Sequence, residues 1–113
     1  MSISLNERYN ASVIQFKGKL VGGPLSSEFY QMLHDLLDQD KKNVVVDLSK
    51  VNFISSSGLG ILISGLTSLR KSGGDLKLAS ISDKIEGLLS ITKLNQIFES
   101  YDSVDKAIES FGN

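Results

Sequence analysis

Three consecutive serines, Ser55, Ser56 and Ser57, are the residues of this chain whose type and spacing could support chemistry. They follow an apolar run and precede Gly58-Leu59-Gly60, which opens an apolar pattern of helical spacing. A serine at such a strand-to-helix junction can act as a nucleophile, accept a phosphate, or cap the helix with its hydroxyl oxygen. The glycines that follow leave the backbone open to close approach by another molecule.

Catalysis by a serine nucleophile is not supported by the other residues. The nucleophile elbow of hydrolases, G-x-S-x-G, is absent,. His34, the single histidine, falls on the polar side of an expected helix, so no general base is available,. Gly58-Leu59-Gly60 lacks the lysine and hydroxyl of a phosphate-binding loop, and no histidine–carboxylate spacing indicates a metal site. The sequence therefore predicts no catalytic residue, no metal and no cofactor, and a protein that is not an enzyme.

The choice between capping and phosphate acceptance stays open at this point. Serine is a preferred N-cap residue, because its side chain accepts a hydrogen bond from a free amide of the first turn. The same position places a hydroxyl at the positive end of the helix dipole. Capping alone explains a single serine, whereas three in succession, followed by glycines, favour a second role for one of them.

A strand and a helix must position these serines. The apolar run Val44–Val46, closed by Asp47 and Leu48, is typical of a strand buried on both faces of a parallel sheet,. We expect a turn at Ser49-Lys50 and then three apolar anchors for the returning chain, Val51, Phe53 and Ile54. The helix ends at Gly73-Gly74, where the chain can turn left-handed. Its apolar stripe is Leu59, Leu62, Ile63, Leu66 and Leu69,.

The remaining segments alternate between strand and helix patterns. An antiparallel hairpin around Asn10 is predicted by the short apolar runs Ile3, Leu5 and Val13, Ile14, Phe16,. Gly18–Gly23 is expected to form a loop. Pro24 begins a helix that runs to about Asp40, with the stripe Leu25, Phe29, Met32, Leu33, Leu36 and Leu37,.

The C-terminal third continues this alternation. After a strand at Asp75–Ala79, Ser82 caps a helix whose expected buried side is Ile85, Leu88, Leu89 and Ile91,. A connector carries Leu94, Ile97 and Phe98, and a last amphipathic helix carries Val104, Ala107, Ile108 and Phe111. Alternating strands and helices predict an open α/β layer with right-handed crossovers, in one domain over residues 1–113.

Length and composition bound the class of protein. The 113 residues are enough for one core without disulfides, and 41% of them are apolar,. Lysine and arginine number 12 against 13 acids, so no strong field favours nucleic acid or a membrane surface,. Cysteine is absent, no apolar run approaches the roughly 20 residues of a membrane helix, and the first residues do not resemble a signal peptide,. We expect a cytoplasmic monomer that binds neither nucleic acid nor membrane.

The stretch D-L-S-K-V-N-F-I-S-S-S-G-L-G, residues 47–60, resembles the signature of STAS domains, in particular the bacterial anti-sigma factor antagonists. The resemblance covers nearly the whole chain. It implies an α/β fold with a central mixed β-sheet of four to five strands and about four flanking helices. In that family a partner kinase phosphorylates the serine or threonine directly before the glycine. That position is Ser57 here, with Ser56 as the alternative.

The resemblance also implies a partner-binding region around the acceptor. Its residues are Ser55, Ser56, Gly58, Leu59, Leu20, Val21 and Gly22. In the family, the loop that begins at Gly18 lies beside the phosphorylation site and often reads G-x-L-D. This chain departs twice from the family pattern, because Ser55 and Val21 stand where aspartates are usual. Both departures remove an acid near the site.

The function implied by the resemblance is a phosphorylation-switched binding protein. Unphosphorylated, it would bind an anti-sigma factor serine kinase and so free a sigma factor, and a metal-dependent serine phosphatase would reset the cycle. The alternative is a constitutive, non-phosphorylated STAS scaffold or interaction module whose serines only cap the helix. The missing acids at Ser55 and Val21 favour this alternative.

Overall fold

The computed structural model describes residues 2–112. Five strands form one sheet in the order β1-β2-β3-β4-β5. The strands are β1 (Ser2–Glu7), β2 (Ser12–Leu20), β3 (Asn43–Ile54), β4 (Asp75–Ala79) and β5 (Ser100–Tyr101). The helices are α1 (Pro24–Asp38), α2 (Ser56–Lys71), α3 (Asp83–Ile91), the 3-10 helix η1 (Leu94–Gln96) and α4 (Val104–Ser110). The predicted α/β fold is confirmed.

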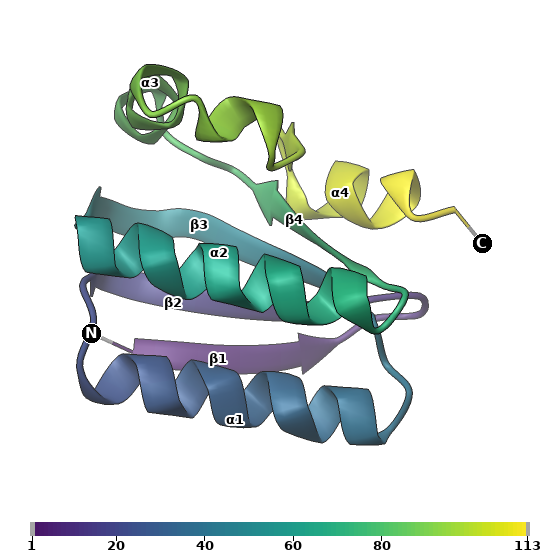
Figure 1. Cartoon of the computed structure of the whole chain (residues 1–113). Coiled ribbons are helices and arrows are strands. Elements are labelled where there is room, and N and C mark those ends of the chain that lie inside the picture. The colour runs from purple at the N-terminus through teal and green to yellow at the C-terminus, as the bar shows by residue number, and fades with distance from the viewer. Residues whose placement is uncertain (1, 113) are drawn as a thin grey trace.

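Strand directions make the sheet mixed, as expected. β1 and β2 form the antiparallel hairpin, closed by a hydrogen bond from Arg8 N to Ala11 O (2.9 Å). All other neighbouring strands are parallel. β2 and β3 therefore end at the same edge of the sheet, and α1 and α2 begin there, at the left in Figure 1. This edge carries the serines.

The sheet separates two apolar clusters, because neighbouring residues of a strand face opposite sides. Val44, Val46 and Leu48 belong to the large cluster under α1, α2 and α3, whereas Val45 packs against Ala107 and Ile108 of α4. α1 and α2 lie side by side (Figure 1), and a Cβ on Gly65 of α2 would stand 2.8 Å from Phe29 Cε2. Glycine at this position therefore lets the two helices pack closely.

The α4 side includes a buried lysine. Lys77 on β4 is only 6% exposed. Its Nζ donates to Ser110 Oγ (2.8 Å) and lies 4.4 Å from the centre of the Phe111 ring. A buried ammonium group needs such partners to offset its lost hydration. Lys77 thus holds the C-terminal end of α4 on the sheet.

Two sequence expectations about chain direction were wrong. The turn at Ser49-Lys50 does not exist, since β3 continues through both residues. The polar pair instead lies at an irregularity in the β2–β3 pairing, where Ser49 N donates to Asp47 Oδ1 (2.9 Å). The expected loop at Gly18–Gly23 begins later, because β2 extends to Leu20. Glycine and polar residues indicated turns here, but a β-bulge uses the same residue types.

Two apolar residues expected in the core are also exposed. Phe53 is 43% exposed, because the neighbouring Ile54 takes the core side of the strand,. Ile91 is 84% exposed. At 3.6 residues per turn it lies about 120° around α3 from Ile85, whereas Ile85 and Leu89 lie on one face and are buried.

Candidate phosphorylation site and binding face

Ser55 is the N-cap of α2. It has extended backbone angles, and its Oγ accepts a hydrogen bond from Gly58 N (3.1 Å). Its own amide donates to Leu20 O (3.0 Å), which joins the start of the helix to the end of β2. Capping therefore accounts for one of the three serines.

Ser56 and Ser57 occupy the first two positions of α2 and are both exposed. Within residues 2–112, neither hydroxyl takes part in a side-chain hydrogen bond. The first turn of α2 contains no acid, and its last turn contains Arg70 and Lys71. A free hydroxyl therefore stands at the positive end of a 16-residue helix whose first turn has no acid to offset the dipole,.

Gly58 has a packing role. A Cβ at this position would stand only 2.1 Å from Leu20 O, far inside contact distance. Glycine is thus required for the first turn of α2 to meet the end of β2. The same contact places the Val21-Gly22 segment beside the helix, since a Cβ on Gly22 would lie 3.2 Å from Ser57 Cβ. The expected proximity of this loop to Ser57 is confirmed.

The residues expected to bind a partner divide into two groups by burial. Ser56 and Val21 are exposed, as is the expected acceptor Ser57, and Ser55 and Gly22 are half-buried. Three others are buried and cannot form the surface: Leu20, Gly58 and Leu59. These three support the exposed group from beneath.

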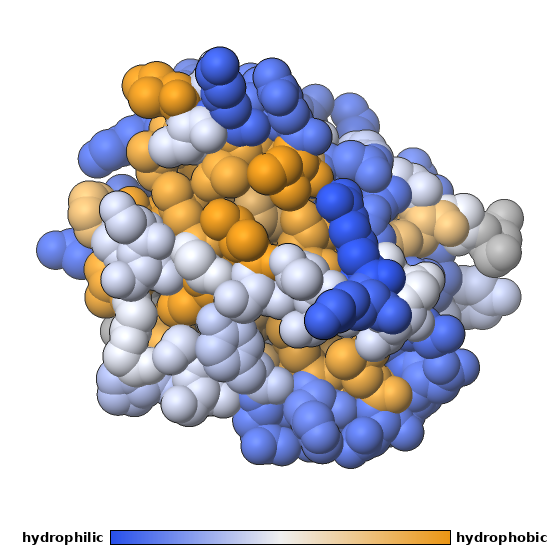
Figure 2. Space-filling view, viewed as in Figure 1, coloured by the Kyte–Doolittle hydropathy of each residue, from blue (hydrophilic) through white to orange (hydrophobic). Residues whose placement is uncertain are grey.

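Two hollows flank the end of β3 that leads to the serines. One, of about 590 Å³, lies between β2 and α1, and its lining includes Lys19, Gly22, Glu28 and Asn52. The other, of about 370 Å³, lies between β3 and α3, and Phe53, Ile54, Ile85, Leu88 and Ile91 give it an apolar lining. Figure 2 shows apolar surface gathered between α2 and α3. The sequence did not predict this hollow, because the apolar character of Phe53 and Ile91 indicated core positions.

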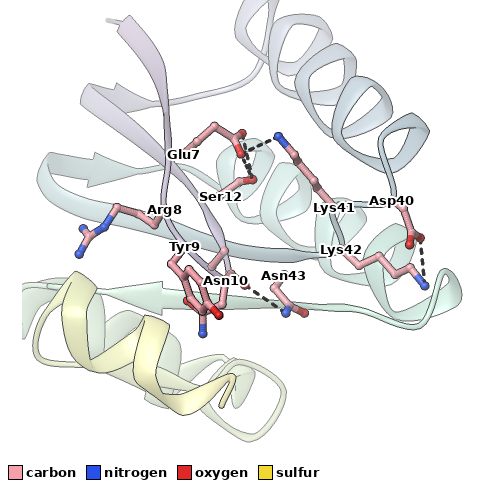
Figure 3. A pocket seen from close by; sticks show the side chains of 10 residues that line it. Glu7, Arg8, Tyr9, Asn10, Ser12, Asp40, Lys41, Lys42 and Asn43 are labelled. Atoms are coloured by element: carbon pink, nitrogen blue, oxygen red, sulfur yellow. Dashed lines mark hydrogen bonds and ion pairs between the residues drawn. The ribbon is translucent and has the colours of Figure 1, made fainter. Parts of the chain in front are cut away.

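A third hollow, drawn in Figure 3, lies at the opposite edge of the sheet, where β2 and β3 begin. It has a volume of about 210 Å³ between the β1–β2 turn and the α1–β3 connection. Its charged groups are paired, with Lys41 Nζ 3.0 Å from Glu7 Oε2 and Lys42 Nζ 3.3 Å from Asp40 Oδ1. Ser12 Oγ also donates to Glu7. The Lys41–Glu7 pair joins the two connections, whereas the Lys42–Asp40 pair lies within one of them.

Other titratable groups lie outside the serine region. Glu99, before β5, has a lowered pKa, chiefly because the Tyr101 hydroxyl donates to its carboxylate (2.7 Å). His34, Asp35 and Asp38 group their side chains on α1, all exposed, with His34 Nδ1 3.4 Å from Asp38 Oδ2. This spacing is that of an i,i+4 pair on a helix surface.

Among residues 2–112, no helix is both long and apolar enough to cross a bilayer.

Known proteins share this sequence and architecture. The STAS domain family model matches residues 2–107. A candidate anti-sigma factor antagonist of Thermotoga maritima is 35% identical over 75 residues, which are 66% of each chain. The anti-sigma-B factor antagonist of Listeria monocytogenes is 30% identical over 103 residues, covering 88% of this chain and 87% of the relative.

Solved structures agree in fold. The crystal structure of a candidate anti-sigma factor antagonist from Thermotoga maritima has a TM-score of 0.82 at 27% identity, covering 96% of this chain and 92% of that one. The anti-sigma factor antagonist SpoIIAA in its unphosphorylated form has a TM-score of 0.74 at 17% identity, with 97% of each chain covered. Phosphorylated SpoIIAA of Bacillus gives 0.75 at 16%, covering 97% of this chain and 99% of that one. With a matching family model, curated relatives and a shared fold, the chain belongs to the STAS domain family, in the group of the anti-sigma factor antagonists.

Proposed function

We propose that this protein is a binding regulator switched by phosphorylation of Ser57. In the unphosphorylated form it captures an anti-sigma factor serine kinase and thereby frees a sigma factor. The kinase transfers phosphate to Ser57 and the complex separates, and a metal-dependent serine phosphatase restores the first state. The observation that carries the proposal is that Ser55 alone caps α2, which leaves the Ser57 hydroxyl exposed and free to accept phosphate.

Electrostatics support a switch that leaves the fold intact. A phosphoserine adds about −1.5 to −2 charges at neutral pH. At Ser57 this charge meets the positive end of the α2 dipole, and the first turn holds no acid to repel it,. Phosphorylation therefore acts at the binding surface, where a partner matched to a neutral hydroxyl meets a dianion.

The surface around Ser57 supports capture of a protein partner. Exposed Val21 and the two hollows on either side of the β3 end surround the serines. The hollow beside α3 provides apolar side chains, Phe53, Leu88 and Ile91, that contribute free energy when a partner covers them,. Protein interfaces commonly combine such an apolar part with polar groups that set specificity.

The second candidate is a constitutive STAS scaffold that is never phosphorylated. The Ser55 cap is compatible with it, because the cap gives one serine of the motif a structural role. The residues Ser55 and Val21, in place of the family's usual acids, favour it as well. The two candidates differ in one observable, the presence of phosphate on the protein.

The decisive experiment is incubation with the candidate kinase and ATP, followed by measurement of the intact mass. We expect one added phosphate, located at Ser57 by peptide mapping and lost in Ser57→Ala. Phosphate located on Ser56 would move the acceptor by one position and keep the switch. An unchanged mass, with kinase binding intact, would favour the scaffold.

A further inference from the structure

Gly22 lies against the side chain of Ser57. A Cβ placed on Gly22 would stand 3.2 Å from Ser57 Cβ and 3.8 Å from Ser57 Oγ. Carbon atoms pack best at about 3.5–4.0 Å, so the first separation is too short for ordinary contact. Gly22 is not among the glycines with positive φ. Available space, rather than backbone conformation, therefore distinguishes glycine from alanine at this position.

The first turn of α2 cannot easily move away from Gly22. Ser55 N donates to Leu20 O, two residues before Gly22, and Gly58 packs against the same carbonyl. Separating the helix from the Val21-Gly22 segment would break that hydrogen bond and open that contact. A Cβ at position 22 would therefore crowd Ser57 Cβ, whose position the backbone fixes, and would narrow the space in which Ser57 Oγ rotates about the Cα–Cβ bond.

We infer that Gly22 is a positioning residue for Ser57. Its missing side chain keeps open the space in which the Ser57 side chain turns and in which a phosphate on Oγ is accommodated. This inference rests on the proposed function, in which Ser57 is the acceptor. Alignment of an acceptor oxygen is demanding, since a misplacement of about 1 Å can lower a rate by about 10²-fold. Gly22 also lines the hollow between β2 and α1, so it separates Ser57 from that recess.

The space can be measured without the kinase. The chain contains no cysteine, so Ser57→Cys introduces a single thiol at the acceptor position. Two probes are applied, methyl methanethiosulfonate, which is small and neutral, and sulfonatoethyl methanethiosulfonate, which is larger and anionic. With either probe, the thiolate introduced by Ser57→Cys attacks the sulfenyl sulfur of the reagent, forms a mixed disulfide and releases methanesulfinate. The ratio of the two rate constants reports the room for an anionic group, because both reactions depend equally on the thiol pKa.

Three glycine variants in the Ser57→Cys background separate space from strain. Gly22→Ala adds a crowded Cβ, and we expect the ratio of the anionic to the neutral rate constant to fall by about fivefold. Gly23→Ala places alanine at φ 83° with no atom within 4 Å of its Cβ, and Gly60→Ala adds a methyl group to α2 in open space. Both should leave the ratio unchanged.

An unchanged ratio in Gly22→Ala overturns the inference, and so does an equal fall in Gly23→Ala, which would assign the effect to loop strain. With the kinase, Gly22→Ala should lower kcat, whereas a rise in KM with kcat unchanged would contradict a positioning role. The two proposals fail separately. If the thiol ratio falls but Ser57 accepts no phosphate, the phosphorylation switch is wrong and the spatial role of Gly22 stands.

Discussion

The first turns of α2 and α3 are built alike and charged differently. Each begins with a serine N-cap, with Ser55 accepting from Gly58 N at 3.1 Å and Ser82 from Ile85 N at 3.2 Å. The first turn of α3 then contains Asp83 and Glu86, whereas that of α2 contains no acid. α4 repeats the α3 pattern with Ser103 and Asp105.

The difference separates the role of a cap from that of an acceptor. A cap needs one hydroxyl, and α3 shows that fixed carboxylates can supply the negative charge that the helix dipole favours. In α2 the positions that correspond to Asp83 and Glu86 are Ser56 and Leu59, which are neutral, and Ser57 corresponds to Lys84. Negative charge is therefore present in the first turn of α2 only after a group such as phosphate has been added. This change in charge is what a phosphorylation switch requires.

The largest expected effect is on the free energy of unfolding, when a glycine of α2 and a glycine of α3 are each replaced by alanine. Gly58→Ala should lower the free energy of unfolding by about 3 kcal/mol or more, because its Cβ would overlap Leu20 O,. Gly87→Ala in α3 has no atom within 4 Å of its Cβ and should raise stability by about 0.5–1 kcal/mol,. Urea denaturation measures both, and equal effects would contradict the close contact at Gly58. Failure of Gly58→Ala to fold would agree with it.

The second effect concerns partner binding. Ser57→Asp should weaken kinase binding by about tenfold or more, since one charge then faces a surface matched to a hydroxyl. Ser64→Asp is the matched control, because Ser64 is an exposed serine later in α2. Calorimetry on both variants decides the matter. Equal affinities of wild type and Ser57→Asp would refute the switch, and equal losses in both variants would indicate a nonspecific effect of charge.

The third effect tests whether the two caps are equivalent. Ser55→Ala and Ser82→Ala should each cost about 1 kcal/mol, because each leaves an amide of the first turn without its acceptor,. Thermal or urea unfolding gives both values. A loss confined to Ser82→Ala would mean that Ser55 does not cap α2 in solution, and the role of cap would pass to a neighbouring serine.

The smallest effect is that of the first-turn charges themselves. Ser57→Asp should raise the free energy of unfolding by about 0.3–1 kcal/mol at neutral pH, and Asp83→Ser should lower it by a similar amount. At the position changed in Ser57→Asp, the helix dipole should favour the ionised carboxylate over the neutral acid in the folded state. The contribution is thus present above the unfolded pKa and lost as pH falls through the folded one. A stability difference between Ser57→Asp and wild type that did not change with pH would rule out the dipole as its cause.

Much of the fold was predictable from periodicity, and the errors have identifiable causes. The helix stripes and the run Val44–Val46 reflect burial, which residue type records directly. The bulge at Ser49-Lys50 and the two-residue β5 depend on pairing with distant strands, which local sequence does not record. Phe53 and Ile91 were misplaced because apolar character indicates the core only if the residue lies on the inward side of its element.

The candidate site was predictable in its location and not in its internal roles. The motif placed the serines at the start of a helix. Which of the three is the N-cap depends on where the backbone changes from extended to helical angles. That residue is Ser55, with ψ 172°, and it is fixed by the hydrogen bond from its amide to Leu20 O. The burial of Leu20 and Leu59 likewise follows from tertiary packing. Motif membership alone gave both of them a surface role.

The contact between Gly58 and Leu20 O has a consequence for tracing how such proteins diverge. A lineage that lost its kinase would be free to replace Ser57, whose hydroxyl makes no side-chain hydrogen bond among residues 2–112. It would still need glycine at position 58 for α2 to pack against the end of β2. A descendant that keeps this glycine would therefore be expected to keep the fold. The glycine would not show whether the descendant still takes part in phosphorylation signalling. Inheritance of the switch has to be judged at position 57.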